Sequence, residues 1–302
     1  IYVEQAFLNY AIKPQINIRA GLMLIPMGII NEYHEPPTFN GVERPNLDSK
    51  IVPTTWREMG AGLYGRFDEA AIRYQLYVVN GFLGYDGEAR LRGSDGFRKG
   101  RQKGAESVIS SPNISSKVEY YGFNGLKLGL SFYSGRTQSS MFDGLRIDDQ
   151  VAQLSADSST VGLSMLGLDY RYNYKGFMTR GQFIYSDIRD SQRYNAFTGS
   201  DLGSAMMGYY IEIGYDILSH SLSNPDGKRL TPFVRYEKYD TQYKIQGDMD
   251  RNLSYHRTDI TAGLTFHVNP RAAFKADYQK FMSDEKSSED RDQLNFGVGV
   301  WF

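Results

Sequence analysis

The chain has 302 residues, a formal net charge of −1 and 41% hydrophobic residues. The nearly neutral charge argues against a general affinity for nucleic acid, and the lack of cysteine excludes disulfides and thiolate metal sites. No apolar run approaches the roughly 18–20 residues that a membrane helix needs. The 23 Tyr and 17 Phe against 10 Pro are instead typical of a chain rich in β-strands.

Apolar and polar side chains alternate along most of the sequence, which is the period of a β-strand with two different faces. Residues 126–132 (LKLGLSF) and 294–302 (LNFGVGVWF) are clear examples. The pattern predicts thirteen strands of about ten residues each. They cover residues 2–10, 15–24, 57–67, 70–80, 115–122, 125–135, 161–173, 176–187, 205–217, 230–241, 257–268, 271–282 and 291–302.

The connections between these strands alternate in length. Short links are predicted at 67–70, 123–125, 174–176 and 269–270, and long ones at 25–56, 81–114, 136–160, 188–204, 242–256 and 283–290. Only the link 218–229 breaks the set of short links. Short turns on one side and long loops on the other are typical of an outer-membrane barrel, and an all-strand chain can span a membrane only as a closed barrel. We therefore expect an all-β, transmembrane antiparallel β-barrel; the alternative is a large soluble β-sandwich with a Tyr-rich core.

The strand count also bears on completeness. Bacterial single-chain barrels have an even number of strands, whereas this chain has about thirteen. The opening residues, IYVEQAFLNY, show no basic region, apolar core or cleavage site of a signal peptide. We expect residues 1–302 to form a single barrel domain that lacks N-terminal strands: one further strand gives fourteen, three give sixteen.

Charged residues occupy the polar, inward face of the predicted strands in nearly balanced numbers. The nine inward basic residues are Arg19, Arg66, Arg73, Lys117, Lys127, Arg171, Arg180, Arg235 and Lys275. The eight inward acidic residues are Glu58, Glu119, Asp169, Glu212, Asp216, Glu237, Asp259 and Asp277. Opposite charges lie two positions apart along one face, such as Lys117 and Glu119, and side chains at this spacing can pair across a strand ladder. They are expected to neutralise a wet lumen, and a role in transport is the alternative.

Two stretches carry a resemblance to a known family: RAGLMLIPMGIINEYHEPPTFNGVERP (19–45) and PTTWREMGAGLYGRF (53–67). They resemble the phosphate-selective porin O/P family, in the form common in Bacteroidetes-type bacteria. The resemblance implies a barrel of about sixteen strands, a homo-trimer, and passage of small solutes past a ladder of basic residues and a loop folded into the lumen. The nearly balanced inward charge departs from such a ladder. The terminal Phe302 fits the assembly signal of outer-membrane barrels.

The long link 25–56 is the first candidate site. It has an apolar start, paired prolines and the charged residues His34, Arg44 and Lys50, with Arg57 directly after it. We expect it to fold into the lumen and narrow it, with the basic residues available to solutes. Capping of the barrel and packing against a partner subunit are the alternatives.

A basic patch in the link 81–114 is the second candidate. Its members lie among glycines and are Arg92, Arg98, Lys99, Arg101 and Lys103. The patch could concentrate anions at the pore mouth or bind lipopolysaccharide phosphates. The alternative is a solvated loop, since its composition predicts weak order.

Catalysis is not indicated. The four histidines, His34, His220, His256 and His267, show neither metal-ligand spacing nor an obvious pairing with a nucleophile and an acid, and no cofactor motif is present. Two functions in the bacterial outer membrane stay open. One is a porin, a homo-trimer in contact with lipid and lipopolysaccharide, for passive diffusion of small hydrophilic solutes that include phosphate-like anions. The other is a plugged barrel that serves as an accessory subunit of a larger envelope complex and offers aromatic residues such as Phe82 and Phe97 to a partner.

Overall fold

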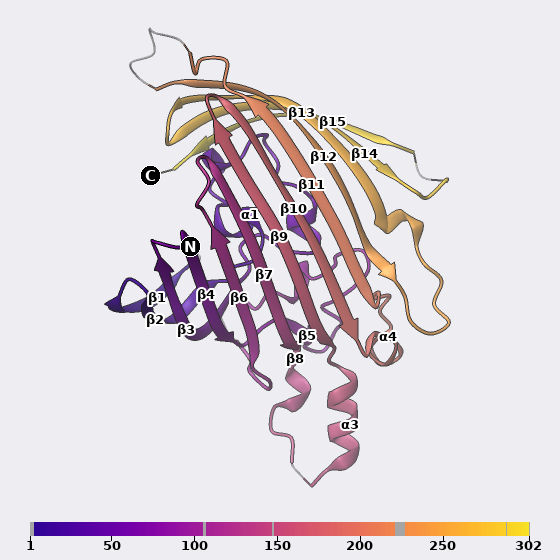
Figure 1. The fold of residues 1–302 in the computed structure, drawn as a ribbon. Helices are drawn as coiled ribbons and strands as arrows, with labels where there is room; N and C mark the ends of the chain where they lie inside the picture. Colours follow the sequence, from indigo (N-terminus) through magenta and orange to yellow (C-terminus); the bar gives the residue numbers. More distant parts are fainter. Residues whose placement is uncertain (1–2, 105–106, 147, 221–226, 288, 302) are drawn as a thin grey trace.

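The main feature of the computed structural model, which describes residues 3–104, 107–146, 148–220, 227–287 and 289–301, is one strongly curved antiparallel sheet (Figure 1). Its thirteen strands pair in chain order, each with the next. They are β1 (Ala6–Lys13), β2 (Ile16–Leu24), β3 (Arg57–Phe67), β4 (Ile72–Val79), β6 (Asn113–Tyr120), β7 (Leu126–Arg136), β9 (Gly162–Tyr174), β10 (Phe177–Arg189), β11 (Ala205–Tyr215), β12 (Arg229–Lys244), β13 (His256–Asn269), β14 (Ala272–Ser283) and β15 (Arg291–Val300). The predicted β architecture is confirmed, with boundaries within a few residues.

The two faces of the sheet differ in the way that the alternation indicates. On β7, Leu130 on the convex face is 48% exposed, whereas the next residue, Ser131, is 1% exposed on the concave face. Exposed Leu, Ile, Val and aromatic side chains recur at every second position on the other strands. A continuous apolar convex face of this kind is stable against hydrocarbon rather than water.

The sheet has two free edges, because β1 and β15 are not paired with each other in the part of the chain that the structure describes. The convex-face side chains of these strands are correspondingly more exposed than those in the middle of the sheet: Leu8 on β1 is 82% exposed and Phe296 on β15 is 74% exposed. Figure 1 shows the resulting shell, with β1 and β15 at its two borders.

The long connections contain short elements, several of which the alternation did not indicate. The link between β2 and β3 holds α1 (Ile29–Glu32), η1 (Pro36–Thr38) and α2 (Leu47–Lys50). Later links hold β5 (Leu83–Tyr85), η2 (Arg98–Gly100), β8 (Gln138–Ser139), η3 (Ser140–Phe142), α3 (Gln150–Ser158), α4 (Ser191–Thr198) and η4 (Leu253–Tyr255). β5 and β8 form a small parallel pair. In Figure 1, α3 and α4 lie at the same end of the sheet.

An apolar core lies inside the curve of the sheet, at the end where the long connections gather. Trp56 stacks on Phe82 with 4.2 Å between ring centroids, Phe82 stacks on Phe97 at 5.3 Å, and Tyr133 from β7 packs edge-on against Trp56 at 4.8 Å. Met23, Val79, Leu163 and Ile184 from the strands join this core. In this part of the expected wet lumen, apolar side chains therefore take the place of water.

The same core corrects two further expectations. Phe82 and Phe97 are fully buried, so they are not available to a partner. The described segment around Leu91 and Phe97 in the link that carries the basic patch is anchored in the core, which differs from the weak order that its composition predicts. The glycine content of this link does not indicate weak order at Gly96. This residue packs against the backbone of Lys50, where the Cβ of any other residue would clash.

Candidate functional site

Residues 25–56 cross the concave side of the sheet and are bound there by side chains of the wall. The backbone N–H of Ile29 donates to Gln182 Oε1 on β10 at 2.7 Å. The N–H groups of Asn46 and Leu47 donate to the two carboxylate oxygens of Glu237 on β12 at 2.9 and 2.7 Å. Buried backbone groups need such partners when they lie outside regular structure. Side chains of the wall therefore hold the loop across the sheet by accepting hydrogen bonds from its backbone.

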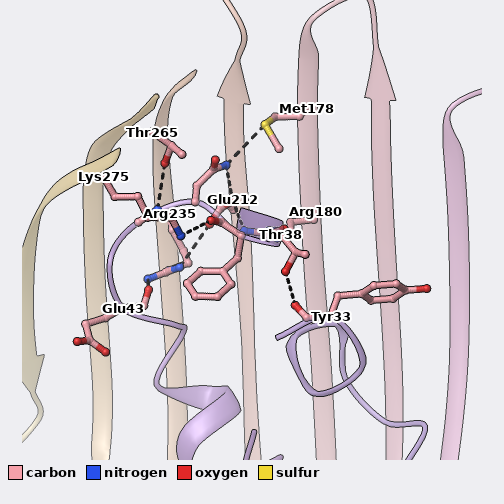
Figure 2. A network of polar contacts seen from close by, with 12 residues as sticks. Tyr33, Thr38, Glu43, Met178, Arg180, Glu212, Arg235, Thr265 and Lys275 are labelled. Carbon is pink, nitrogen blue, oxygen red and sulfur yellow. Dashed lines mark hydrogen bonds and ion pairs between the residues drawn. The ribbon is translucent and has the colours of Figure 1, made fainter. Parts of the chain in front are cut away.

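Glu212 on β11 is the centre of the largest group of these contacts (Figure 2). Its carboxylate accepts hydrogen bonds from Arg180 Nη2 at 2.7 Å, from Arg235 Nη1 at 3.4 Å and from Asn40 Nδ2 of the loop at 2.9 Å. Arg235 also donates to the carbonyl oxygen of Glu43 at 3.1 Å. A buried carboxylate with these partners is compensated without a solvent contact.

Other acids of the wall are used in the same way. Asp259 on β13 accepts a hydrogen bond from Asn46 Nδ2 at 2.7 Å, and Asp277 on β14 accepts one from the N–H of Val42. Lys275, two positions before Asp277 on β14, donates to the carbonyl oxygen of Phe39 at 2.7 Å. The acids thus accept hydrogen bonds from the loop, and Lys275 donates one to a carbonyl oxygen of the loop.

Charged side chains of β6 pair with charged side chains of other strands and of the loop, in agreement with the predicted pairing across the strand ladder. Lys117 forms an ion pair with Asp169 at 3.0 Å and another with Glu32 of the loop, while Glu119 pairs with Arg171 at 2.5 Å and with Arg73 at 3.5 Å. Side chains two apart on one strand run parallel, so partners on neighbouring strands approach more closely. Structural neutralisation is what this cluster achieves.

A cavity of about 630 Å³ lies between the loop and strands β14 and β15. Its charged lining residues are Arg44, Arg98, Arg101, Lys275 and Arg291, against a single acid, Glu43. A neighbouring cavity of about 440 Å³ shares Arg98 and Arg291 and adds Lys50, Arg257 and Asp95. The space left open along this side of the bore is therefore strongly basic, although the wall as a whole is nearly neutral.

The arginines of the larger cavity have neutral partners. Arg44 donates to the carbonyl oxygen of His34 at 2.8 Å, Arg98 to Ser49 Oγ at 2.7 Å, and Arg101 to Thr55 Oγ1 at 3.0 Å. No described carboxylate forms an ion pair with any of these three guanidinium groups. Burial, followed by the neighbouring Arg98, lowers the pKa of Arg101 to about 10. Clustered cations without a counter-charge favour an anion.

The structure separates the predicted loop residues. Arg44 lines the larger cavity, and Lys50 lines the smaller one while its Nζ donates to the carbonyl oxygen of Ser94 at 2.7 Å. His34 is buried, with Nε2 2.9 Å from Glu4 Oε1. The expectation that Arg57 is available to solutes is wrong: its side chain is buried, and Nε donates to the carbonyl oxygen of Lys103 at 3.3 Å.

The predicted basic patch is divided as well. Arg98 and Arg101 turn into the larger cavity. Lys99 pairs with Asp95 at 2.9 Å and Arg92 with Glu88 at 3.8 Å, outside that lining. The basic residues therefore do not form a single patch, because the buried ring of Phe97 places Arg98 and Arg101 on the inner side of the sheet.

The remaining predicted wall charges lie away from the cavity. Arg19 covers the ring of Phe7 at 4.3 Å, and Arg66 pairs with Asp68 at 3.3 Å near a short turn. Lys127 lies opposite Arg171 in the ladder, and Glu58 is buried and accepts from Trp56 Nε1 at 2.9 Å. Asp216 accepts from the N–H of Leu230 at 3.0 Å. Phe302 lies outside the described residues.

Sequence reasoning missed two cavity residues, Arg257 and Arg291. Both lie in predicted strands at inward positions, so the alternation contained the signal. Phe281 was missed as well, although it also lies at an inward position of a predicted strand. Its ring centroid lies 4.4 Å from Cζ of Arg291.

Comparison with known sequences finds one relative. No protein-family model matches the chain. An uncharacterized protein of Aquifex aeolicus (strain VF5) is 30% identical over 299 residues, which cover 96% of this chain. The chain spans 63% of the length of that relative.

Three solved structures have a similar fold. An anion-selective porin from Comamonas acidovorans gives a TM-score of 0.53 at 14% identity, covering 95% of this chain and 74% of that one. OmpF of Salmonella typhi, in complex with daunomycin, gives 0.55 at 12% identity over 94% and 74%. The outer membrane channel DcaP of Acinetobacter baumannii gives 0.51 at 11% identity over 94% and 70%.

These likenesses establish the fold of an outer-membrane β-barrel. Together with the apolar convex face, this fold agrees with the expected location in an outer membrane. The described helices are all too short or too polar to cross a membrane.

Proposed function

We propose that this chain forms the wall and the inward loop of an outer-membrane porin through which small hydrophilic anions diffuse passively. The observation that carries the proposal is the basic cavity beside the loop, where five basic residues, Arg44, Arg98, Arg101, Lys275 and Arg291, face one acid. Anion preference follows the charge that lines the narrow part of a pore rather than the total charge of its wall.

The wall and the loop divide the work. Glu212, Glu237 and Asp277 accept hydrogen bonds from the loop, so their negative charge is compensated where the bore is narrowed. Arg98 and Arg101 have no such carboxylate partner among the described residues, and their N–H groups can replace part of the hydration of a passing anion. The loop thereby converts a nearly neutral wall into a basic passage.

Ion selectivity in planar bilayers tests this proposal. In a KCl gradient, the reversal potential is expected to show chloride preference, and the double variant Arg98→Gln, Arg101→Gln is expected to lower the chloride-to-potassium permeability ratio roughly fivefold. Arg146→Gln, at a side chain 80% exposed and paired only locally with Asp148, is the matched control. A cation-selective channel, or a double variant that equals the control, contradicts the proposal.

The finer architecture is also a proposal. Free edges at β1 and β15 are costly in lipid, because unpaired backbone groups have no partner there. We propose that three further strands join these edges to give sixteen, and that the complete barrel belongs to the phosphate-selective porin O/P family, assembles as a homo-trimer and admits phosphate among its solutes. Chemical cross-linking in detergent would show the trimer.

One observation favours a second function, that of a plugged barrel which serves as an accessory subunit. The apolar core around Trp56, Phe82 and Tyr133 fills the bore on the side of β3 to β10. If the basic cavities do not connect across the membrane, no current will flow. Single-channel recording separates the two functions: stable current steps support the porin, and a silent barrel that retains a partner through purification supports the accessory role.

A further inference from the structure

The larger basic cavity has an apolar side as well as a cationic one. Pro36, Val42 and Phe281 line it together with the arginines, and none of the three is fully buried. The ring of Phe281 lies 4.4 Å from Arg291 Cζ, and the ring of Phe39 lies 3.9 Å from Lys275 Nζ and 5.7 Å from Arg44 Cζ. Cations thus stand directly beside apolar surface that remains accessible.

We propose that this passage binds small organic carboxylates with a flat apolar body, of which an aromatic monocarboxylate is the simplest case, more tightly than the inorganic oxyanions that it also admits. The inference rests on the proposed porin function and names the class of solute that its basic cavity selects.

The two sides of the cavity recognise different parts of such a solute. Planar guanidinium groups bind carboxylates with paired N–H donors. Of the five N–H groups of Arg98, one donates to Ser49 Oγ among the described residues. An apolar body gains contact with Val42 and Phe281, whereas a hydrated inorganic anion gains nothing from them. A purely electrostatic anion filter would be lined by polar side chains on every side.

The size and position of the cavity agree with this class. About 630 Å³ lies within the range of roughly 300–1,000 Å³ that accommodates small organic ligands. Val42 packs on the inner surface of β15, where a Cβ at Gly297 would lie 2.9 Å from Val42 Cγ1. Because glycine at this position lets the loop approach the wall, the apolar side is fixed in place rather than adaptable.

Current block in planar bilayers tests the inference with named probes. Benzoate, acetate and inorganic phosphate are added separately to one side of a single open channel in KCl. We expect benzoate to interrupt the current at a concentration about tenfold lower than acetate or phosphate, a difference that one well-placed apolar contact can supply.

Two cavity variants and one control locate the effect. Phe281→Ala is expected to raise the half-blocking concentration of benzoate severalfold, and Val42→Ser provides a second test if that variant does not insert. Phe274→Ala is the matched control, because Phe274 lies on the same strand but on the lipid-facing side, 54% exposed. The control is expected to behave as the unaltered protein.

The outcomes are distinguishable from failure of the porin proposal. An anion-selective channel that benzoate, acetate and phosphate block equally overturns the inference and leaves the proposed function standing. Benzoate block that neither cavity variant weakens also overturns it. A cation-selective channel removes the proposed function and the inference together.

Discussion

At the scale of single residues, charges on the inner side of the sheet serve two purposes that their partners reveal. Glu237 and Asp277 accept backbone N–H groups of the loop and act as anchors. Arg98 and Arg101 donate to hydroxyl and carbonyl oxygens and keep their charge uncompensated by carboxylates. The acids of the wall therefore hold the loop, whereas the two arginines of the link between β4 and β6 keep a free positive charge.

Asp48 in α2 provides a prediction on pH. Its Oδ1 accepts from Gln182 Nε2 at 3.0 Å, while its buried Oδ2 has no hydrogen-bond partner. Burial raises the pKa of this carboxyl from 3.8 to about 7. The folded state thus keeps the proton between about pH 4 and 7, where the unfolded state releases it, so this group's contribution to stability falls as pH rises through that window.

We expect Asp48→Asn to remove that pH dependence. The ionised carboxylate costs on the order of 4 kcal/mol at pH 8, from about 1.4 kcal/mol per pKa unit, and a neutral amide avoids this cost. Amide hydrogen exchange of residues 47–52, corrected for intrinsic rates, is the measurement at pH 5 and pH 8. Unchanged pH dependence in the variant would show that Asp48 is not the titrating group.

At the scale of elements, the strands and the loop differ in what holds them. Each strand is fixed by a ladder to its neighbours, whereas α2 has only four residues and depends on the wall. Glu237 accepts the N–H groups of Asn46 and Leu47 at its start and so caps the element from a distant strand. Loss of this one side chain leaves two buried donors unpaired.

Glu237→Gln is therefore expected to loosen the loop without unfolding the barrel. Replacement of one carboxylate oxygen by an amide N–H places two donors face to face, a cost of about 1–3 kcal/mol. The expected result is a noisier current and faster proteolytic cleavage within residues 33–50. Glu285→Gln, at an exposed side chain bonded only to Ser287, is the control, and equal cleavage of the two variants would contradict this role.

At the scale of the whole molecule, the proposed porin function depends on what fills the curved sheet. The aromatic core fills one side of the bore and the basic cavities lie along the other, next to β12, β14 and β15. The free edge at β1 lies on the opposite border of the shell (Figure 1). A working pore requires that this border be closed.

Closure leads to a prediction on hydrogen exchange. Amides of β1 that do not bond to β2 have no partner in the sheet as described, and they exchange rapidly if the edge is free. In the complete protein inserted in a bilayer, we expect them to be protected to the same degree as amides of β2, within about tenfold. Rapid exchange confined to these amides would show that the edge stays open.

The strands, their inward and outward faces and the alternation of short and long connections were determined by the sequence alone. The physical reason is that adjacent residues of a strand face different environments. The apolar Leu130 and the polar Ser131 therefore indicate by their own residue types which face each one occupies. The tertiary structure decided what fills the bore and which charges stay free. Glu237 lies 190 residues from its partner Leu47, and no local pattern relates them. A wall with balanced charge encloses a basic cavity because the folded loop binds acids of the wall.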